Sequence, residues 1–377
     1  MTFACTQENL LQGLSLVSHI AGKNPNLPIL ANVLLKTDGG NLKLSTTNLE
    51  MAVSVIVRGR VEAPGEFTVP VKLLQDYVSL LSPGKVEMAL REEGLEIKAD
   101  GKVTVIKGVG ASEFPLIPRL AKENGYHLQA ETLRQAIGQV AFAVSNSESR
   151  PELSGVSCVF YPTGKPDTLV MAATDSYRLA ERVVALQPGG NGRELRCIIP
   201  ARALLEIGRM LSVYRDEVAM PESVEWCITE SQLVFSYGNI ELISRLIEGS
   251  FPDYRPLIPT QFRSMVQVGR AELGKAIRAA SLFARQGIYD VQMDLVGDGS
   301  MSVSSSDSGT GTHTTMLKGA HEGEPNKITL NFKYVADGLN AMGSEQVTLR
   351  LVDAFSPVVM SPTQGEGFQY VVMPIRQ

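Results

Sequence analysis

The chain of 377 residues carries one pattern three times, at intervals of about a third of its length. The pattern begins with apolar residues at spacing i, i+4, i+7, which predicts one face of a helix. The three copies are Leu10, Leu14 and Val17; Leu133, Ile137 and Val140; and Leu273, Ile277 and Ala280. Self-similarity over a whole domain length predicts tandem duplication of one domain type.

Three further signals recur in the same order. A helix start with a basic residue stands at 70–74, 200–204 and, more loosely, 331–335. A polar doublet follows a strand-like run at Thr47-Asn48, Thr174-Asp175 and Ser306-Asp307, and each third closes on an apolar residue and a proline, at 114–115, 251–252 and 373–374. We therefore expect domains at 1–125, 126–258 and 259–377, each of roughly 125 residues, the commonest domain size.

Composition indicates a soluble globular protein, with 44% hydrophobic and 20% charged residues. Its four cysteines are Cys5, Cys158, Cys197 and Cys227; they are far apart and form no CxxC pair, which favours free thiols in a reducing compartment. The N-terminus has no signal-like segment, and no apolar run approaches the ~18 residues that span a bilayer. We expect a cytoplasmic protein with no membrane association, and composition alone leaves open whether the compartment is a bacterial cytoplasm or a eukaryotic cytosol.

Each third reads as helix, strands, helix, strands. The helices are predicted at 9–21, 70–81, 132–144, 200–211, 272–284 and 332–342, with Asn9 or Thr6 able to cap the first. Residues 302–315 have the composition of a linker but align with a hairpin in the other copies, so we place them inside the third domain. Two helices and about eight short strands per unit predict an α+β fold, with helices packed on antiparallel sheet.

Motifs for catalysis or metal binding are weak. Asp307-Ser308-Gly309 resembles an aspartic-protease signature, but that chemistry needs two carboxylates and no second copy occurs; we expect a turn. The glycine pairs at 108–110 and 309–311 do not open a helix, the four histidines have no ligand spacing, and no Gly-x-Ser-x-Gly elbow occurs. We expect no metal, no cofactor and no catalytic residue.

Basic residues recur on the predicted helices, although the net charge is −5. On any single helix they indicate a solvated face. On five helices of six, they predict a locally positive surface for phosphate contacts. They are Lys72, Arg134, Arg202, Arg209, Lys275, Arg278 and Lys333.

Six segments, spread from end to end, closely resemble those of one family in the same order. They are NLPIL at 26–30, TNLEM at 47–51, RPELSGV at 150–156, ATDSYRLA at 173–180, GSFPDY at 249–254 and YVVMPIR at 370–376. The family is that of the bacterial DNA polymerase III β subunits, the sliding clamps.

The resemblance implies a non-enzymatic processivity factor. Two chains, each of three similar domains, would close head to tail into a ring around duplex DNA, with the strand at 103–107 and the helix end at Leu282 and Phe283 as interface candidates. Asn24 stands where a DNA-contacting arginine is frequent, which leaves Lys23 as the nearest charge. The implied partners are the replicative polymerase α subunit, the clamp loader, and other polymerases and repair proteins that bind through short peptide motifs.

The resemblance also implies a peptide pocket between the second and third domains, in which Arg178, Asn331 and Arg376 would fix a peptide backbone or a Gln side chain. Its residues would be Leu153, Thr174, Tyr177, Arg178, Leu179, Pro252, Leu257, Asn331, Tyr334, Phe355, Pro357, Val371, Val372, Met373, Pro374, Ile375 and Arg376. The family commonly has Gly-His at Ser176-Tyr177, a basic residue at Pro256 and an aliphatic residue at Gln377, so partner preference is open. Tyr177 is expected to narrow the slot.

Two alternatives from other classes stay open on the sequence. One is a hydrolase or transferase on a duplicated α+β scaffold, which turnover would reveal. The other is a DNA-binding regulator of the antitoxin or repressor kind, which would need a sequence-reading helix; these helices offer scattered charges instead.

Overall fold

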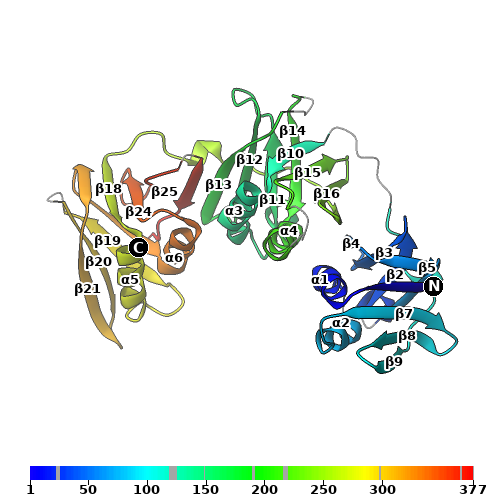
Figure 1. Ribbon diagram of the computed structural model, residues 1–377. Coiled ribbons are helices and arrows are strands. Elements are labelled where there is room, and N and C mark those ends of the chain that lie inside the picture. Colours follow the sequence, from blue (N-terminus) through cyan, green and yellow to red (C-terminus); the bar gives the residue numbers. More distant parts are fainter. Residues whose placement is uncertain are drawn as a thin grey trace. The chain divides into compact units, whose positions relative to one another are not determined.

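The computed structural model describes residues 1–22, 26–118, 125–147, 149–188, 192–214, 220–296, 299–365 and 367–376. Within them the chain forms six α-helices at the predicted places (Figure 1). Their bounds are α1 Gln7–Val17, α2 Val71–Ser79, α3 Ala130–Val140, α4 Ala201–Val213, α5 Arg270–Ser281 and α6 Phe332–Ala341. The ends lie a few residues from the predicted ones; Thr6, for example, caps α1 because its Oγ1 accepts a hydrogen bond from Asn9 N at 3.2 Å.

By Cα proximity the chain forms two compact units. The first unit comprises Met1–Arg134, Leu186–Asn191 and Glu206–Leu246, and the second comprises Gln135–Ala185, Gly192–Leu205 and Ile247–Gln377. Short 3₁₀ turns complete the helical elements: η1 Pro28–Ala31, η2 Ala111–Glu113, η3 Ala141–Ala143, η4 Pro151–Leu153 and η5 Arg255–Leu257.

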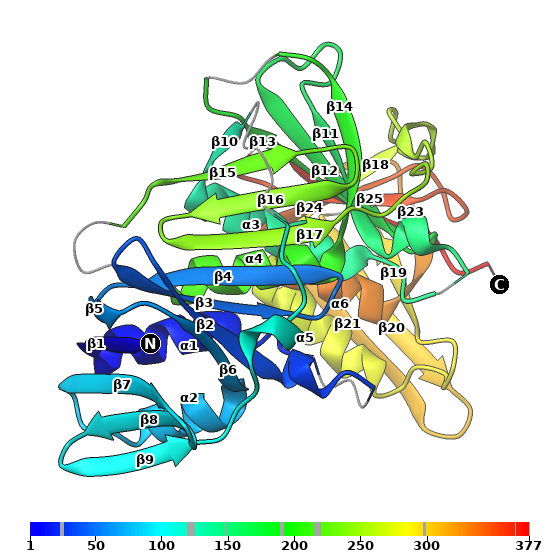
Figure 2. The same cartoon turned by 90° about the vertical axis from the view of Figure 1, so that its right-hand side faces the viewer.

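The first unit holds a five-stranded sheet, β5-β1-β7-β8-β9, and an eight-stranded sheet, β10-β15-β16-β17-β4-β3-β2-β6. Their strands are β1 Thr2–Thr6, β2 Asn32–Asp38, β3 Asn41–Thr47, β4 Met51–Val57, β5 Arg60–Ala63, β6 Glu66–Pro70, β7 Lys85–Arg91, β8 Gly94–Ala99, β9 Lys102–Ile106, β10 Tyr126–Gln129, β15 Ser223–Ile228, β16 Gln232–Tyr237 and β17 Ile240–Arg245. The larger sheet joins two repeats, because β17 pairs antiparallel with β4 (Figure 2).

The second unit holds a nine-stranded sheet, β14-β11-β12-β13-β26-β25-β24-β18-β22, and a four-stranded sheet, β21-β20-β19-β23. Their strands are β11 Gly155–Phe160, β12 Thr168–Thr174, β13 Arg178–Ala185, β14 Leu195–Pro200, β18 Ser264–Gly269, β19 Asp290–Leu295, β20 Ser300–Asp307, β21 Gly311–Lys318, β22 Ala320–Gly323, β23 Asn326–Asn331, β24 Gln346–Leu351, β25 Val358–Pro362 and β26 Phe368–Val372. Here β13 and β26 join the second and third repeats, in the way that β4 and β17 join the first two.

The apolar triads that open each repeat are all in the core, as their spacing predicts. Leu10, Leu14 and Leu133 have no exposed surface, and Leu273 and Ala280 are equally buried. Helix α1 packs on β3 and β4 of one sheet and on β1 of the other, with α2 beside it (Figure 1). In the third repeat α5 packs on β18 to β21 and on α6. The α+β fold with helices on antiparallel sheet is confirmed.

The serine-rich segment at 302–315 is a hairpin and not a linker. Strand β20 pairs with β21 over its whole length, from Ser300↔Lys318 to Asp307↔Gly311. Asp307 Oδ1 accepts hydrogen bonds from Gly309 N and Thr310 N at 2.9 and 3.2 Å, so the protease-like Asp-Ser-Gly motif is a turn, as expected.

In the described part of the chain, no helix is long and apolar enough to cross a membrane. Among the same residues, no group of three or more His, Cys, Asp or Glu side chains is placed to hold a metal ion. The four cysteines are free, and three of them are buried.

Candidate functional site

A pocket of about 180 Å³ lies in the second unit where β13 and β26 meet. The β12–β13 turn, β26 with the residue after it, and the segment around Pro252 form its walls. The lining residues are Arg150, Thr174, Ser176, Arg178, Leu179, Pro252, Asp253, Tyr254, Leu257, Val371 and Met373. Most of the lining is apolar with a few polar groups at one side, the common character of a ligand pocket.

The β12–β13 turn is fixed by the side chains of its own first two residues. Thr174 Oγ1 donates to Arg178 O at 2.6 Å and accepts from Ser176 N at 3.0 Å. Asp175 Oδ1 accepts from Tyr177 N and Arg178 N at 2.9 and 3.0 Å. These bonds hold Ser176 at φ 79°, in the left-handed region that non-glycine residues enter rarely. The pocket wall is therefore preorganised.

Arg178 stabilises this wall from behind. Its Nε donates to Asp175 at 2.9 Å, Nη1 to Asp337 of α6 at 2.5 Å, and Nη2 to the Phe142 carbonyl at 3.0 Å. The guanidinium also lies 4.7 Å from the centre of the Tyr334 ring, a cation–π distance. Its side chain is only 12% exposed, and its guanidinium is engaged within the protein.

The apolar side of the pocket is continuous with a core cluster. Leu179, Val371 and Tyr254 belong to this cluster, in which Ala172 and Val359 are also buried. The Tyr254 hydroxyl donates to Glu181 at 2.5 Å. Burial, and then the neighbouring Glu181 carboxylate, raise the pKa of Tyr254 above its ordinary value, so the phenol stays protonated and keeps donating.

Seven of the seventeen residues expected in the pocket line it: Thr174, Arg178, Leu179, Pro252, Leu257, Val371 and Met373. Leu153 and Val372 are buried beneath, and Pro357 is half-buried. Tyr177 is 64% exposed and is not in the lining, so its ring does not narrow the pocket in this structure. Its carbonyl accepts a hydrogen bond from Met373 N at 2.9 Å.

The remaining expected residues are not in the lining of the pocket. Asn331 caps α6 by accepting from Lys333 N at 2.9 Å, and the Tyr334 carbonyl accepts from the Tyr370 hydroxyl at 3.0 Å. Ile375 N donates to Thr329 O at 2.8 Å. Others of the expected set are Phe355, 69% exposed, Pro374, half-buried, and Arg376, exposed.

Four lining residues were not among those expected. Arg150 lies at the rim, where its Nη1 donates to Ser176 Oγ at 3.4 Å and its Nε to Glu152 at 3.0 Å. Asp253 and Tyr254 complete the wall beside Pro252. All four, Arg150, Ser176, Asp253 and Tyr254, lie inside the motifs at 150–156, 173–180 and 249–254, so taking every residue of these motifs as a candidate would have found them.

The basic residues on the helices have different surroundings. Lys72, Arg202, Lys275, Arg278 and Lys333 are exposed. Arg134 is half-buried and its Nε donates to Glu131 at 2.7 Å. Arg209 is bound internally, to buried Glu206 and to the carbonyls of Ser15 and Leu16 at 3.1 and 2.9 Å. Lys23 lies outside the described residues.

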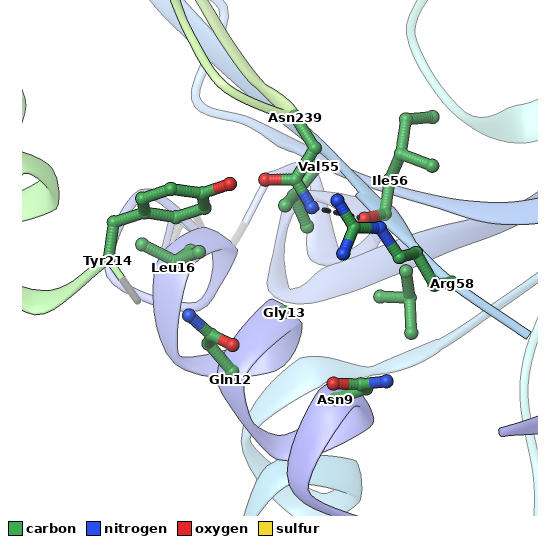
Figure 3. A pocket seen from close by; sticks show the side chains of 10 residues that line it. Asn9, Gln12, Gly13, Leu16, Val55, Ile56, Arg58, Tyr214 and Asn239 are labelled. Atoms are coloured by element: carbon green, nitrogen blue, oxygen red, sulfur yellow. Dashed lines mark hydrogen bonds between the residues drawn. The ribbon is translucent and has the colours of Figure 1, made fainter. Parts of the chain in front are cut away.

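A second, smaller hollow of about 80 Å³ lies in the first unit, between α1, the end of β4 and the β16–β17 turn (Figure 3). Asn239 Nδ2 donates to the Ile56 carbonyl, while its Oδ1 is buried without a described partner. Gly13 allows α1 to approach β4 here, because a Cβ would lie 2.6 Å from Val57 Cγ2. The hollow is lined by three amide side chains and Arg58 beside several apolar residues: Asn9, Gln12 and Asn239 on the polar side, and Leu16, Val55, Ile56, Val57 and Tyr214 among the rest.

Comparison with known proteins gives one consistent family. Sequence models of the N-terminal, central and C-terminal domains of the DNA polymerase III beta subunit match residues 1–118, 127–253 and 255–376. The chain is 31% identical to the beta sliding clamp of Synechococcus elongatus, over 100% of this chain and 99% of that protein. It is 27% identical to the beta sliding clamp of Staphylococcus aureus over the same shares.

Solved structures agree with the sequence matches. The DNA polymerase III subunit beta of Pseudomonas aeruginosa is 25% identical, with a TM-score of 0.89 over 100% of both chains. A sliding clamp from the same organism, bound to griselimycin, is 26% identical with a TM-score of 0.91, again over 100% of both chains.

Proposed function

This chain belongs to the family of bacterial DNA polymerase III β subunits, and we propose that it acts as a DNA sliding clamp in three domains, 1–125, 126–258 and 259–377. It encircles duplex DNA and tethers polymerases to it. The observation that carries the proposal is the match of all three domain models, in order, over nearly the whole chain. A topological tether needs no catalytic group, so the protein is a processivity factor and not an enzyme. We place its work in the cytoplasm.

The contacts to DNA are weak and do not depend on the base sequence of the DNA. The cations assigned to them are Lys23, Lys72, Arg134, Arg202, Arg209, Lys275, Arg278 and Lys333. Exposed lysine and arginine head groups meet phosphates through screened, quickly exchanging contacts, which permit sliding. Arg209 contributes least, because Glu206 and two carbonyls already occupy its guanidinium.

Ring closure takes place between two copies of the chain, head to tail. Strand β9 is an edge strand of the five-stranded sheet, and Val103 and Val105 on it are 61% and 42% exposed. Leu282, at the end of α5, is 74% exposed. An exposed apolar edge strand is a liability that pairing with a second chain removes. These surfaces therefore support a dimer in which the first domain meets the third domain of the other copy.

The pocket of the second unit receives the short peptide motifs of the partners. These are the replicative polymerase α subunit, the clamp loader, and other polymerases and repair proteins, which dock one at a time. Its apolar wall of Leu179, Leu257 and Val371 suits a leucine–phenylalanine pair. The rim cation Arg150 and the exposed Arg376 suit a glutamine side chain or a peptide carbonyl.

Titration with a fluorescent peptide that carries a Gln and a Leu-Phe pair tests the pocket. Leu257 is 59% exposed, so a bound peptide covers it. Loss of that apolar contact in Leu257→Ser is expected to weaken binding about tenfold, or about 1.4 kcal/mol. Leu205→Ser is the matched control, since Leu205 is 53% exposed on α4 away from the pocket. Deletion of residues 373–377 should abolish binding with the dimer intact; undiminished affinity would show that the pocket is elsewhere.

A further inference from the structure

The turn between β3 and β4 repeats the turn of the peptide pocket bond for bond. Thr47 Oγ1 donates to Met51 O at 2.9 Å and accepts from Leu49 N at 3.1 Å. Asn48 Oδ1 accepts from Glu50 N and Met51 N at 3.1 and 2.9 Å. Leu49 has φ 76°, against 79° for Ser176. The frame that forms one pocket wall in the second unit therefore exists a second time, in the first unit.

The strands beside this turn also correspond. Arg245 N donates to Glu50 O at 3.0 Å, as Met373 N donates to Tyr177 O at 2.9 Å. Strand β4 pairs Ala52 with Ile243 of β17, and β13 pairs Leu179 with Val371 of β26. Arg245 thus occupies the position of Met373, and Ile243 occupies that of Val371.

Arg150 at the rim of the pocket and the wall around Pro252 have counterparts in the first unit as well. Leu27 precedes the 3₁₀ turn η1 with φ −136° and ψ 73°, and Arg150 precedes η4 with φ −133° and ψ 73°. The sequence Phe-Pro at 114–115 matches Phe-Pro at 251–252. In the alignment of the repeats Leu116 therefore corresponds to Asp253, and Ile117 corresponds to Tyr254. Ile117 packs on the buried cluster of Cys227, Val234 and Ile243, as Tyr254 packs in its own cluster.

Three polar positions of the pocket are leucines in this copy. Leu27 replaces Arg150, Leu49 replaces Ser176, and Leu116 replaces Asp253. Their exposed fractions are 41%, 46% and 99%. The one cation in the matching set is Arg245, which is exposed and forms no ion pair with any other described residue. The surface is consequently more apolar than the pocket, with a single positive charge at its edge.

Leu49 is the most informative of these leucines. A left-handed backbone is unfavourable for a residue with a bulky side chain, and glycine or asparagine fills such positions at lower cost. An exposed leucine there gains nothing from solvent. The Thr47 and Asn48 hydrogen bonds hold the turn in this conformation and so keep the Leu49 side chain at the surface, 46% exposed. An apolar side chain held in a strained, exposed position is a candidate for contact with a partner.

From these correspondences we propose that Leu27, Leu49, Leu116, Ile117, Ile243 and Arg245 form a second docking site, for a peptide segment of a protein partner with two large apolar side chains and an acidic one. The proposal rests on the proposed function, since the pocket's peptide sets the kind of occupant. The leucines take the apolar side chains and Arg245 takes the carboxylate. A single cation does not suit a nucleic-acid backbone, which needs several.

The probe is a synthetic eight-residue peptide with a Leu-Phe pair beside two aspartates and an N-terminal benzophenone. It is photo-crosslinked to the full chain and to the chain that lacks residues 373–377, and the adducts are mapped by mass spectrometry. We expect adducts in fragments that contain Leu49 or Leu116 in both proteins. Adducts confined to the pocket of the full chain would overturn the proposal and leave the proposed function intact, whereas no binding anywhere would count against both.

The variants give each position the residue that the pocket has. Leu49→Ser with Leu116→Asp is expected to weaken the site in the truncated chain at least about tenfold. The matched control is Leu73→Ser, at a leucine 54% exposed on α2. Arg245→Glu should weaken binding of the aspartate peptide and strengthen binding of a peptide in which lysines replace the aspartates. A fold defect would instead weaken binding of both peptides. Equal affinity in all variants, or self-association that the double variant removes, would refute a peptide partner here.

Discussion

Replacing Arg178 by methionine tests the claim that this side chain holds the pocket wall in place. Methionine keeps an apolar stem but removes the donors to Asp175, Asp337 and the Phe142 carbonyl. Asp175 is 15% exposed, so loss of its charged hydrogen bond and of the part-buried bond to the Phe142 carbonyl is expected to cost about 2 kcal/mol. Asp337 is 46% exposed, and solvent screening reduces the contribution of its ion pair with Arg178 to the unfolding free energy to about 0.5 kcal/mol.

The expected loss is therefore about 2.5 kcal/mol of unfolding free energy. For a domain of about 150–250 residues this lowers Tm by about 5–10 °C. Thermal unfolding followed by circular dichroism measures it, with Asp337→Asn as the control that should lose about 0.5 kcal/mol. Peptide affinity at a temperature where the variant is folded should also fall, because the Asp175 carboxylate, which accepts two backbone hydrogen bonds of the turn, loses the Arg178 hydrogen bond that positions it. A Tm of Arg178→Met within 2 °C of the parent, or an equal loss in Asp337→Asn, would refute the reasoning.

Three other changes have defined outcomes. Replacing Lys72 and Lys333 by glutamine should weaken DNA binding equally for all sequences and reduce the log–log salt slope by up to about 2, as measured by titration at several salt concentrations; base-sequence dependence would contradict it. Gly338→Ala should destabilise the fold by about 1–3 kcal/mol in denaturant, because its Cβ would lie 2.4 Å from Tyr370 Cδ1; an unchanged midpoint would show that the ring moves aside. Burial raises the pKa of the Cys5 thiol from 9.0 to about 12, so its alkylation at pH 8 should be far slower in the folded protein than in the unfolded chain. Because the folded state favours the neutral thiol, the contribution of Cys5 to the free energy of unfolding should be lost as the pH rises from 9 towards 12. Rapid alkylation of the native protein would contradict this.

The helices and their buried faces could be predicted from the sequence because their periodicity is local. Leu10, Leu14 and Val17 are buried as their spacing requires. Each third was expected to begin with a helix, so the strands β1, β10 and β18, which lead directly into those helices, were not expected; neither were β5, β14 and β22. A pattern of four to six residues carries too little alternation to be separated from the helix that follows.

The candidate site could be predicted only in part. The resemblance of the motifs to the clamp family implied a pocket at Thr174, Leu179 and Val371, and all three line the pocket of the second unit. The role of Arg178 could not be read from the sequence, because its partner Asp337 lies 159 residues away. The left-handed backbone of Leu49 likewise has no local sequence signal, since leucine is not a residue that favours positive φ. Backbone conformation and long-range pairing come from tertiary packing, which a local pattern does not contain.

The most direct test of the central claim is retention on DNA of defined topology. The protein is loaded onto a nicked circular plasmid with a bacterial clamp loader and ATP, separated by gel filtration in high salt, and the plasmid is then cut once. A closed ring should stay on the circle, because salt screens the phosphate contacts but does not open the topological link. It should leave when the DNA becomes linear. Equal retention on circular and linear DNA, or complete loss from the circle in high salt, would contradict the clamp.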